Sequence, residues 1–85
     1  MKYVNYTVHL LQYILHMKLG NNLKRCRFDH NDMSQEDLAN EIGVTRQSIH
    51  SIEKGKFIPS TYLALKLAKF FNKSVEEIFF INEDE

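Results

Sequence analysis

The chain has 85 residues, enough for one small domain with a hydrophobic core of limited size. Eleven basic and eleven acidic residues give a net charge of zero, which argues against indiscriminate, charge-driven binding to nucleic acid. A hydrophobic content of 44%, with regular helical periodicity, argues against a disordered chain. The single cysteine, Cys26, excludes an internal disulfide and fits a reducing compartment, so we expect a cytoplasmic protein.

The charges are unevenly distributed along the chain. Residues 76–85 contain five acidic residues and no basic one. Residues 1–75 therefore carry eleven basic against six acidic residues, a net charge of +5. The larger part of the chain is basic, as a protein that contacts phosphate needs to be.

The first 20 residues form an N-terminal extension with two competing patterns. Apolar and aromatic residues alternate with polar ones as in a strand, at Val4, Tyr6, Val8 and Leu10. A second set fits one face of a helix, at Val4, Val8, Leu11 and Leu15. The segment is short and interrupted by polar residues, and it has no small-residue cleavage site, so we expect neither a membrane span nor a signal peptide. Two interpretations stay open: an arm that packs on a partner subunit, or a translated leader upstream of a start at Met17.

Cys26 and His30 are four residues apart, on or near a helix expected around residues 22–28. Two metal ligands could have this spacing, but two ligands do not make a structural zinc site. We therefore expect Cys26 in the core, His30 in solvent, and no metal or other cofactor. The sequence shows no glycine-rich phosphate loop, carboxylate pair or nucleophile arrangement, and we do not expect an enzyme.

Two short helices joined by a tight turn are predicted between Ser34 and Gly55. Ser34 can cap the first helix, and Asp37 then lies where a carboxylate favours the positive helix end. Met33 and Leu38 have the spacing of a hydrophobic staple. The first helix can end at Gly43, which adopts a positive φ without a Cβ penalty.

The second helix repeats the same signals. Thr45 can serve as its N-cap, and Val44 and Ile49 form a second staple pair. Ala39 in the first helix is small enough for the second to approach closely. Two capped helices around a glycine turn are typical of a helix-turn-helix, in which the second helix enters the DNA major groove.

The second helix separates an inward face from an outward face. Ile49 and Ile52 point inward with Val44. The outward residues suit base edges and phosphates, and they are Arg46, Gln47, His50, Ser51 and Lys54. Gln35 opens the first helix, where backbone N–H groups favour a phosphate. The alternative is an ordinary solvated helix face, with Gln35 as a plain first-turn residue.

Two more helices are predicted downstream. Pro59 disfavours helical geometry at Ile58, and Ser60 can cap a helix over residues 61–71. Ser74 and Glu77 form a capping box for a last short helix. That helix is expected to end in an apolar run, Ile78, Phe79, Phe80 and Ile81. We predict a dimer contact there, and the alternative is that these residues close the chain's own core with one or two exposed.

The segment SQEDLANEIGVTRQSIHSIEKGKFIPSTYLALKLAKFFNKSVEEIF resembles the lambda-repressor-like, XRE/Cro-type family of small DNA-binding domains. The resemblance covers residues 21–80. It implies an all-α, compact bundle of five short helices that binds operator DNA, usually as a dimer. It also implies an ion pair between Glu53 and an arginine of the first helix, which here is Arg27. The stretch between Arg27 and Gln35 is one residue longer than the commonest family spacing.

We therefore predict three regions: an extension over 1–20, a helix-turn-helix domain over 21–81, and an acidic tail over 82–85. The predicted DNA-binding residues are Gln35, Thr45, Arg46, Gln47, Ser48, His50, Ser51 and Lys54. The predicted function is transcriptional repression, through binding of double-stranded DNA at a pseudo-palindromic operator as a homodimer. The alternative is a protein-interaction module, such as an antitoxin, that captures a protein partner through the N-terminal arm or the apolar C-terminus.

Overall fold

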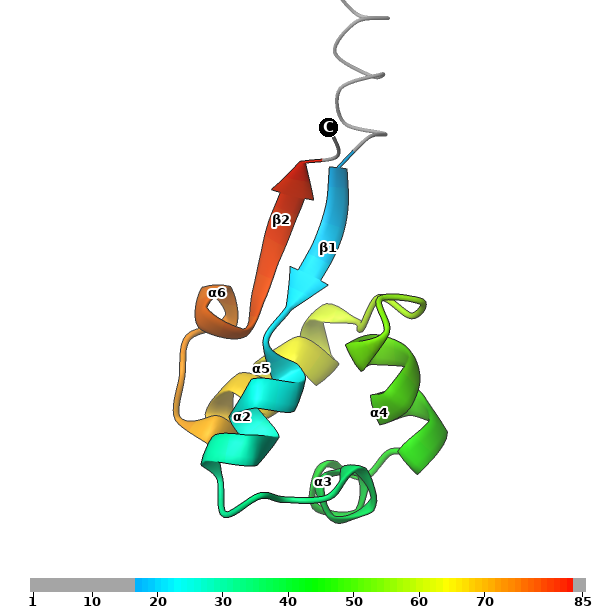
Figure 1. Ribbon diagram of the computed structural model, residues 1–85, viewed down its shortest axis with the longest axis vertical. Coiled ribbons are helices and arrows are strands. Elements are labelled where there is room, and N and C mark those ends of the chain that lie inside the picture. Colours follow the sequence, from blue (N-terminus) through cyan, green and yellow to red (C-terminus); the bar gives the residue numbers. More distant parts are fainter. Residues whose placement is uncertain (1–16, 84–85) are drawn as a thin grey trace, which may run out of the picture.

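The computed structural model describes residues 17–83. Their elements in chain order are β1 (Met17–Asn21), α2 (Leu23–Asp29), α3 (Gln35–Ile42), α4 (Arg46–Glu53), α5 (Thr61–Phe71), α6 (Val75–Ile78) and β2 (Phe79–Glu83). The helices form one body from which the β1–β2 ribbon projects (Figure 1). The predicted five helices are present. The all-α class is too narrow, because the described chain also contains this two-stranded antiparallel sheet.

The predicted capping residues begin the helices as expected. The hydroxyls of Ser34, Thr45 and Ser60 each accept a hydrogen bond from the backbone N–H three residues later. Ser74 and Glu77 form both bonds of the capping box. Gly43 follows α3 with a φ of 87°, a left-handed conformation that favours glycine. Local side-chain chemistry therefore determines where these four helices start.

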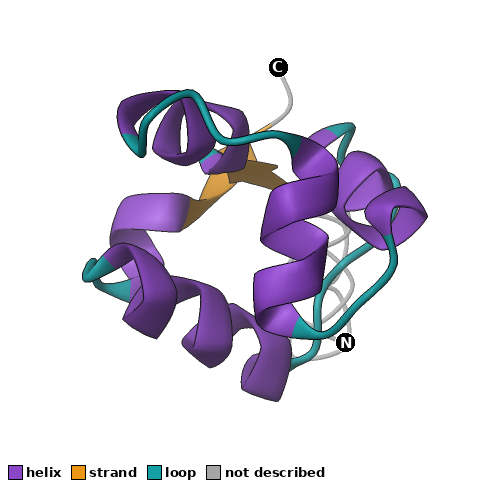
Figure 2. Ribbon diagram, turned by 90° about the horizontal axis from the view of Figure 1, so that it is seen from below, coloured by secondary structure: helices purple, strands orange, loops and turns teal. Residues whose placement is uncertain are grey.

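The core lies where the inward faces of all five helices meet. Seen from the end opposite the ribbon, the helices surround it (Figure 2). Its largest fully buried side chains come from every helix, and they are Leu23, Leu38, Ile49, Ile52, Leu67 and Ile78. Lys66 of α5 donates from Nζ to the Ile42 carbonyl, 2.6 Å away, and so satisfies an unpaired carbonyl at the end of α3.

The turn between α2 and α3 contains two residues with positive φ. Asn31 and Asp32 adopt φ values of 58° and 52°, in the left-handed region that Asn and Asp tolerate better than most residues. Their backbone reverses direction before Met33, whose N–H donates to the Arg27 carbonyl. The turn ends directly before Ser34, whose hydroxyl caps α3.

The prediction that the last helix runs into the Ile78–Ile81 run is wrong. Helix α6 ends at Ile78, and Phe79 begins strand β2 with extended φ and ψ of −119° and 137°. The strand pairs antiparallel with β1, with Leu19 opposite Ile81 and Gly20 opposite Phe80. Ile and Phe suit a strand as well as a helix, and pairing with β1 makes residues 79–83 a strand.

The two strands of the ribbon lie across the predicted boundaries. The expected boundary between residues 20 and 21 falls inside β1, and Asn82 and Glu83 of the expected acidic tail belong to β2. The alternating pattern of residues 4–10, and the question of an arm or a leader, lie outside the described residues. Within residues 17–83, no helix is long and apolar enough to cross a lipid bilayer.

Candidate nucleic-acid interface

Helix α4 presents the polar face predicted for a recognition helix. Ile49 and Ile52 are buried in the core. Arg46, Gln47 and Lys54 are exposed. The remaining predicted DNA-binding residues of this helix are partly buried, and they are Ser48, His50 and Ser51. Arg46 and Gln47 therefore lie exposed at the start of α4, and Lys54 lies exposed just beyond its end.

Thr45 and Ser48 are engaged with each other at the start of α4. The Ser48 N–H donates to Thr45 Oγ1 at 3.1 Å, and the two hydroxyl oxygens lie 2.9 Å apart. These contacts satisfy an otherwise unpaired N–H of the first turn. Both side chains therefore stabilise the N-terminus of α4.

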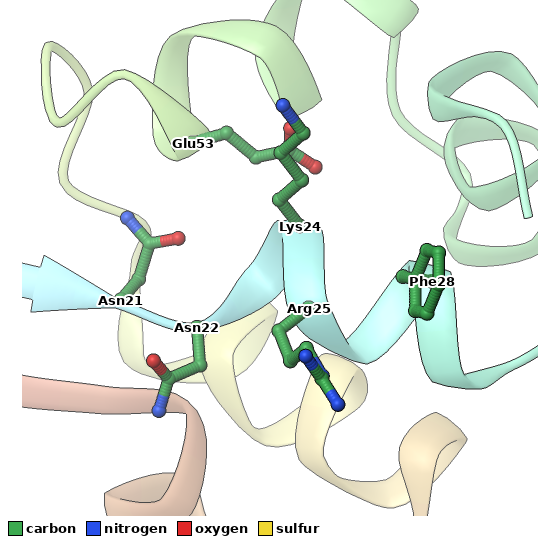
Figure 3. Close-up of a pocket in the computed structure, with 6 residues that line it drawn as sticks. All are labelled: Asn21, Asn22, Lys24, Arg25, Phe28 and Glu53. Atoms are coloured by element: carbon green, nitrogen blue, oxygen red, sulfur yellow. The ribbon is translucent and has the colours of Figure 1, made fainter. Parts of the chain in front are cut away.

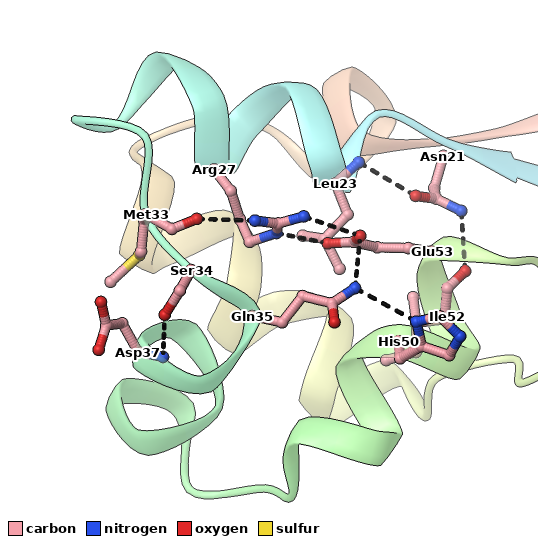
Figure 4. Close-up of polar contacts among 10 residues, drawn as sticks. All are labelled: Asn21, Leu23, Arg27, Met33, Ser34, Gln35, Asp37, His50, Ile52 and Glu53. Carbon is pink, nitrogen blue, oxygen red and sulfur yellow. Dashed lines mark hydrogen bonds and ion pairs between the residues drawn. The ribbon is translucent and has the colours of Figure 1, made fainter.

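A salt bridge fixes the other end of α4 to α2 (Figure 4). Arg27 Nε donates to Glu53 Oε2 at 2.6 Å, and Arg27 Nη2 donates to Glu53 Oε1 at 3.0 Å. A third nitrogen of Arg27, Nη1, donates to the Met33 carbonyl at 2.7 Å. The ion pair implied by the family resemblance is thus present, and it joins α2, α4 and the start of α3.

The electrostatics of Glu53 follow from this geometry. Burial on its own would raise the pKa of Glu53, but hydrogen bonds from Arg27 and Gln35 and the charges of Arg27 and Lys24 lower it overall. The hydrogen bond to Glu53 correspondingly raises the pKa of Arg27. The pair is therefore ionised in the folded domain at neutral pH.

Gln35 also donates a hydrogen bond to Glu53. Its Nε2 donates to Glu53 Oε1 at 3.0 Å and lies 3.4 Å from His50 Nδ1 (Figure 4). The sequence predicted Gln35 as a phosphate contact, but gave no sign of its bond to Glu53. That bond joins the start of α3 to the end of α4, two positions whose proximity depends on the interhelical turn.

A basic concavity lies beside α4. Its lining combines four cationic side chains, one carboxylate, an amide and an imidazole, and these are Lys24, Arg27, Arg46, Lys54, Glu53, Gln35 and His50. Apart from the imidazole, four positive charges against one negative charge give the lining a net charge of +3. Such a site attracts a phosphate group.

Lys24 lines this concavity, although it is not among the DNA-binding residues predicted from the sequence. It extends from α2 toward Glu53 (Figure 3) and also lines a neighbouring hollow with Arg25 and Phe28. A usable signal was present, because Lys24 stands three residues before Arg27 and therefore shares its helix face. The family resemblance identified only the arginine.

A hydrogen bond attaches the ribbon to the C-terminal end of α4. Asn21 Nδ2 donates to the Ile52 carbonyl at 2.9 Å, and the Leu23 N–H donates to Asn21 Oδ1 at 3.0 Å. One side chain therefore joins β1, the start of α2 and the last turn of α4 (Figure 4). The direction of α4 is set by Asn21 as well as by Arg27.

The residues predicted for dimerisation occupy two environments. Ile78 and Phe79 are 0% and 7% exposed and belong to the chain's own core. Phe80 and Ile81 are 37% and 59% exposed. Only these last two have large accessible apolar surfaces.

Cys26 and His30 lie as expected from the sequence. Cys26 is buried in the core, and burial raises the pKa of its thiol. His30 is exposed, and its ring lies 5.1 Å from the ring of Phe70. Packing accounts for the position of both side chains.

Comparisons with known proteins agree with this arrangement. The helix-turn-helix family model matches residues 23–78. An HTH-type transcriptional regulator of Methanocaldococcus jannaschii is 54% identical over 67 residues, which cover 79% of this chain and all of that protein. The HTH-type transcriptional regulator YgzD of Bacillus subtilis is 45% identical over 60 residues, covering 71% of this chain and 86% of YgzD.

A solved structure has the same fold. The crystal structure of the transcriptional regulator VanUg superposes with a TM-score of 0.65, covering 81% of this chain and 91% of VanUg, at 17% sequence identity. The polar face of α4, the capped turn before it and the match over residues 23–78 lead to one conclusion. The chain belongs to the helix-turn-helix family of DNA-binding transcriptional regulators.

Proposed function

We propose that this regulator is a repressor that binds a pseudo-palindromic operator as a homodimer, with α4 of each copy in the major groove. One observation carries the proposal: α4 has an accessible polar face, while Arg27 and Asn21 hold its C-terminal end in one orientation. A recognition helix needs this combination, because base contacts are specific only when the helix is held at a defined position. Bound in this way, the dimer would obstruct RNA polymerase.

The exposure of each side chain suggests a division of roles. Gln47 can form two hydrogen bonds with an adenine edge, and Arg46 can do so with guanine O6 and N7. Ser51 and His50 would read bases further along α4. Thr45 and Ser48 contribute through the helix start.

The basic concavity supplies the backbone contacts. We assign Lys24 and Lys54 to phosphate binding, because they line it beside the recognition helix. Gln35 would contact phosphate through the backbone N–H groups at the start of α3, because its side-chain amide donates to Glu53. Arg27 lines it as well, but its guanidinium is engaged with Glu53. These contacts would position the protein without reading sequence.

The test is selection of binding sites from a random duplex library with the full chain. We expect an enriched site with two half-sites related by a two-fold axis, about one helical turn or 34 Å apart. Gln47→Ala or Arg46→Ala should then relax base preference within each half-site by about 1–3 kcal/mol. Retention of the parent's preference by both variants, or failure to enrich any site, would contradict the proposal.

A further inference from the structure

The side-chain amide of Gln35 lies between Glu53 and His50. Its Nε2 is 3.0 Å from Glu53 Oε1 and 3.4 Å from His50 Nδ1 (Figure 4). The nitrogen of a glutamine amide carries two hydrogens, so it can donate to both partners at once. One side chain at the start of α3 therefore contacts two residues of α4.

Glu53 determines which way this amide faces. A carboxylate paired with Arg27 only accepts hydrogen bonds, so the nitrogen of the Gln35 amide has to face it, and the oxygen cannot. Arg27 holds the carboxylate in place through two hydrogen bonds. The amide therefore cannot turn over without losing its bond to Glu53, and its second N–H stays directed at His50 Nδ1.

We propose that Gln35 is a positioning residue for His50 and thereby determines which base edges His50 can read, a proposal that rests on the DNA-binding face proposed above. A ring nitrogen that accepts a hydrogen bond carries no proton, so the proton of the neutral imidazole is on Nε2. His50 then offers DNA one donor. That donor suits guanine O6 or N7, adenine N7 or thymine O4, and it does not suit the amino group of cytosine.

The place of His50 on α4 suits a base contact of this kind. His50 is half-buried, and it follows the exposed Arg46 by four residues. Residues at this spacing share a helix face, so His50 would read a base close to the one contacted by Arg46. With Nδ1 engaged by Gln35, Nε2 is the ring nitrogen that remains for DNA.

Nitrogen NMR of the histidine side chains tests the positioning of His50 in the full chain without DNA. At about pH 8 an ordinary imidazole is neutral, and the shifts of its two nitrogens show which one carries the proton. We expect His50 of the parent to be almost entirely in the Nε2–H form. Gln35→Ala should increase its Nδ1–H form several-fold, and the exposed His30 provides the reference in the same spectra. Asn40→Ala, which removes an exposed amide of α3, is the matched control and should change neither ring.

Selection of binding sites tests which base edge His50 reads. His50→Ala should relax the preference at one base pair of each half-site by about 2- to 10-fold, the effect of losing one hydrogen bond. Gln35→Ala should relax the same base pair and leave those read by Arg46 and Gln47 unchanged. In a His50→Ala background, Gln35→Ala should have no further effect on base preference, because its effect acts through His50.

Two NMR results would overturn the positioning role: a parent whose His50 carries its proton on Nδ1, or a proton distribution that Gln35→Ala leaves unchanged. Relaxed preference at every base pair in Gln35→Ala would overturn the selective effect on His50, since loss of the helix position alone would produce it. If the NMR results are as expected but the parent enriches no binding site, the operator and the base contact are refuted together. The positioning of His50 by Gln35 is then upheld.

Discussion

Arg27 of α2 and Glu53 of α4 form a salt bridge whose side chains are only 13% and 7% exposed. Two parallel N–H···O contacts join them, which restricts the relative orientation of the two side chains as well as their distance. Because Glu53 is the last residue of α4, the pair sets the position of the recognition helix against the rest of the domain. Its removal should affect folding before it affects base preference.

Arg27→Ala should lower the free energy of unfolding by about 1.5–3 kcal/mol, because it removes the cationic hydrogen-bond partner of the partly buried Glu53 carboxylate. Urea unfolding monitored by circular dichroism measures the loss. Arg25→Ala is the matched control. Its partner is Asp29, in an exposed pair with side chains 72% and 50% accessible, and such pairs contribute at most about 1 kcal/mol. Equal losses in the two variants would show that Arg27 has no special role.

Acid should destabilise the domain through Glu53. Burial opposes ionisation of Glu53, but the hydrogen bonds from Arg27 and Gln35 bring its pKa below the ordinary value of 4.5. Because this folded-state pKa is depressed, the stabilisation is complete above about pH 4.5 and is lost as the pH falls through the lower, folded-state pKa. The free energy of unfolding should therefore fall with pH in that window, as urea titrations at a series of pH values would show.

Glu53→Gln should flatten that acid dependence. The Glu77 carboxylate is a second contributor, because its hydrogen bonds with Ser74 lower the pKa of Glu77 as well. Glu77→Gln is therefore a useful companion, since Glu77 is exposed and acts only at the start of α6. If the free energy of unfolding depended on pH in Glu53→Gln as it does in the parent, protonation of Glu53 would not be the cause of the acid destabilisation.

Lys24→Ala should weaken DNA binding by a similar factor for all sequences, because a phosphate contact carries no base information. The slope of log K against log salt should become shallower by about 1. Fluorescence anisotropy with the selected operator at several salt concentrations would measure it. Lys69 is exposed on α5 and lines none of the concavities described above, so Lys69→Ala should leave the slope unchanged. An unchanged slope in Lys24→Ala would remove this residue from the interface.

Gly20→Ala should destabilise the ribbon. A Cβ at this position would lie 2.5 Å from Phe80 Cε2 and from Asn82 Nδ2, too close without movement of both side chains. Since these are the ends of partly exposed side chains that can move aside, we expect a loss of about 1 kcal/mol in thermal or urea unfolding. In a Phe80→Ala background the same substitution should cost less, and the double-mutant cycle measures that coupling. Equal costs in the two backgrounds would show that the Phe80 ring does not require glycine.

Features that depend on neighbouring residues were predictable from the sequence. Ser34, Thr45 and Ser60 are caps because a hydroxyl meets an N–H three residues away, and Gly43 is a helix end because of its own backbone freedom. The alternation of buried and exposed positions along α4 follows in the same way from helical periodicity.

Features that depend on distant residues were not predictable in this way. The Ile78–Ile81 run suits a helix or a strand equally well, and only pairing with Met17–Asn21 makes it a strand. The bond from Gln35 to Glu53 required the angle between α3 and α4. The salt bridge between Arg27 and Glu53 was expected only because of the family resemblance, since their separation in the sequence carries no local signal.

The pairing of β1 with β2 has a consequence for how the domain folds. The ribbon joins the two ends of the described chain, with Met17 opposite Glu83, so the loop that it closes contains every helix of the domain. Closing so large a loop costs chain entropy before the strand pair returns any stabilisation. We therefore expect the helices to assemble first and the ribbon to form late. Substitutions at Gly20 or Phe80 should then accelerate unfolding while leaving the refolding rate nearly unchanged.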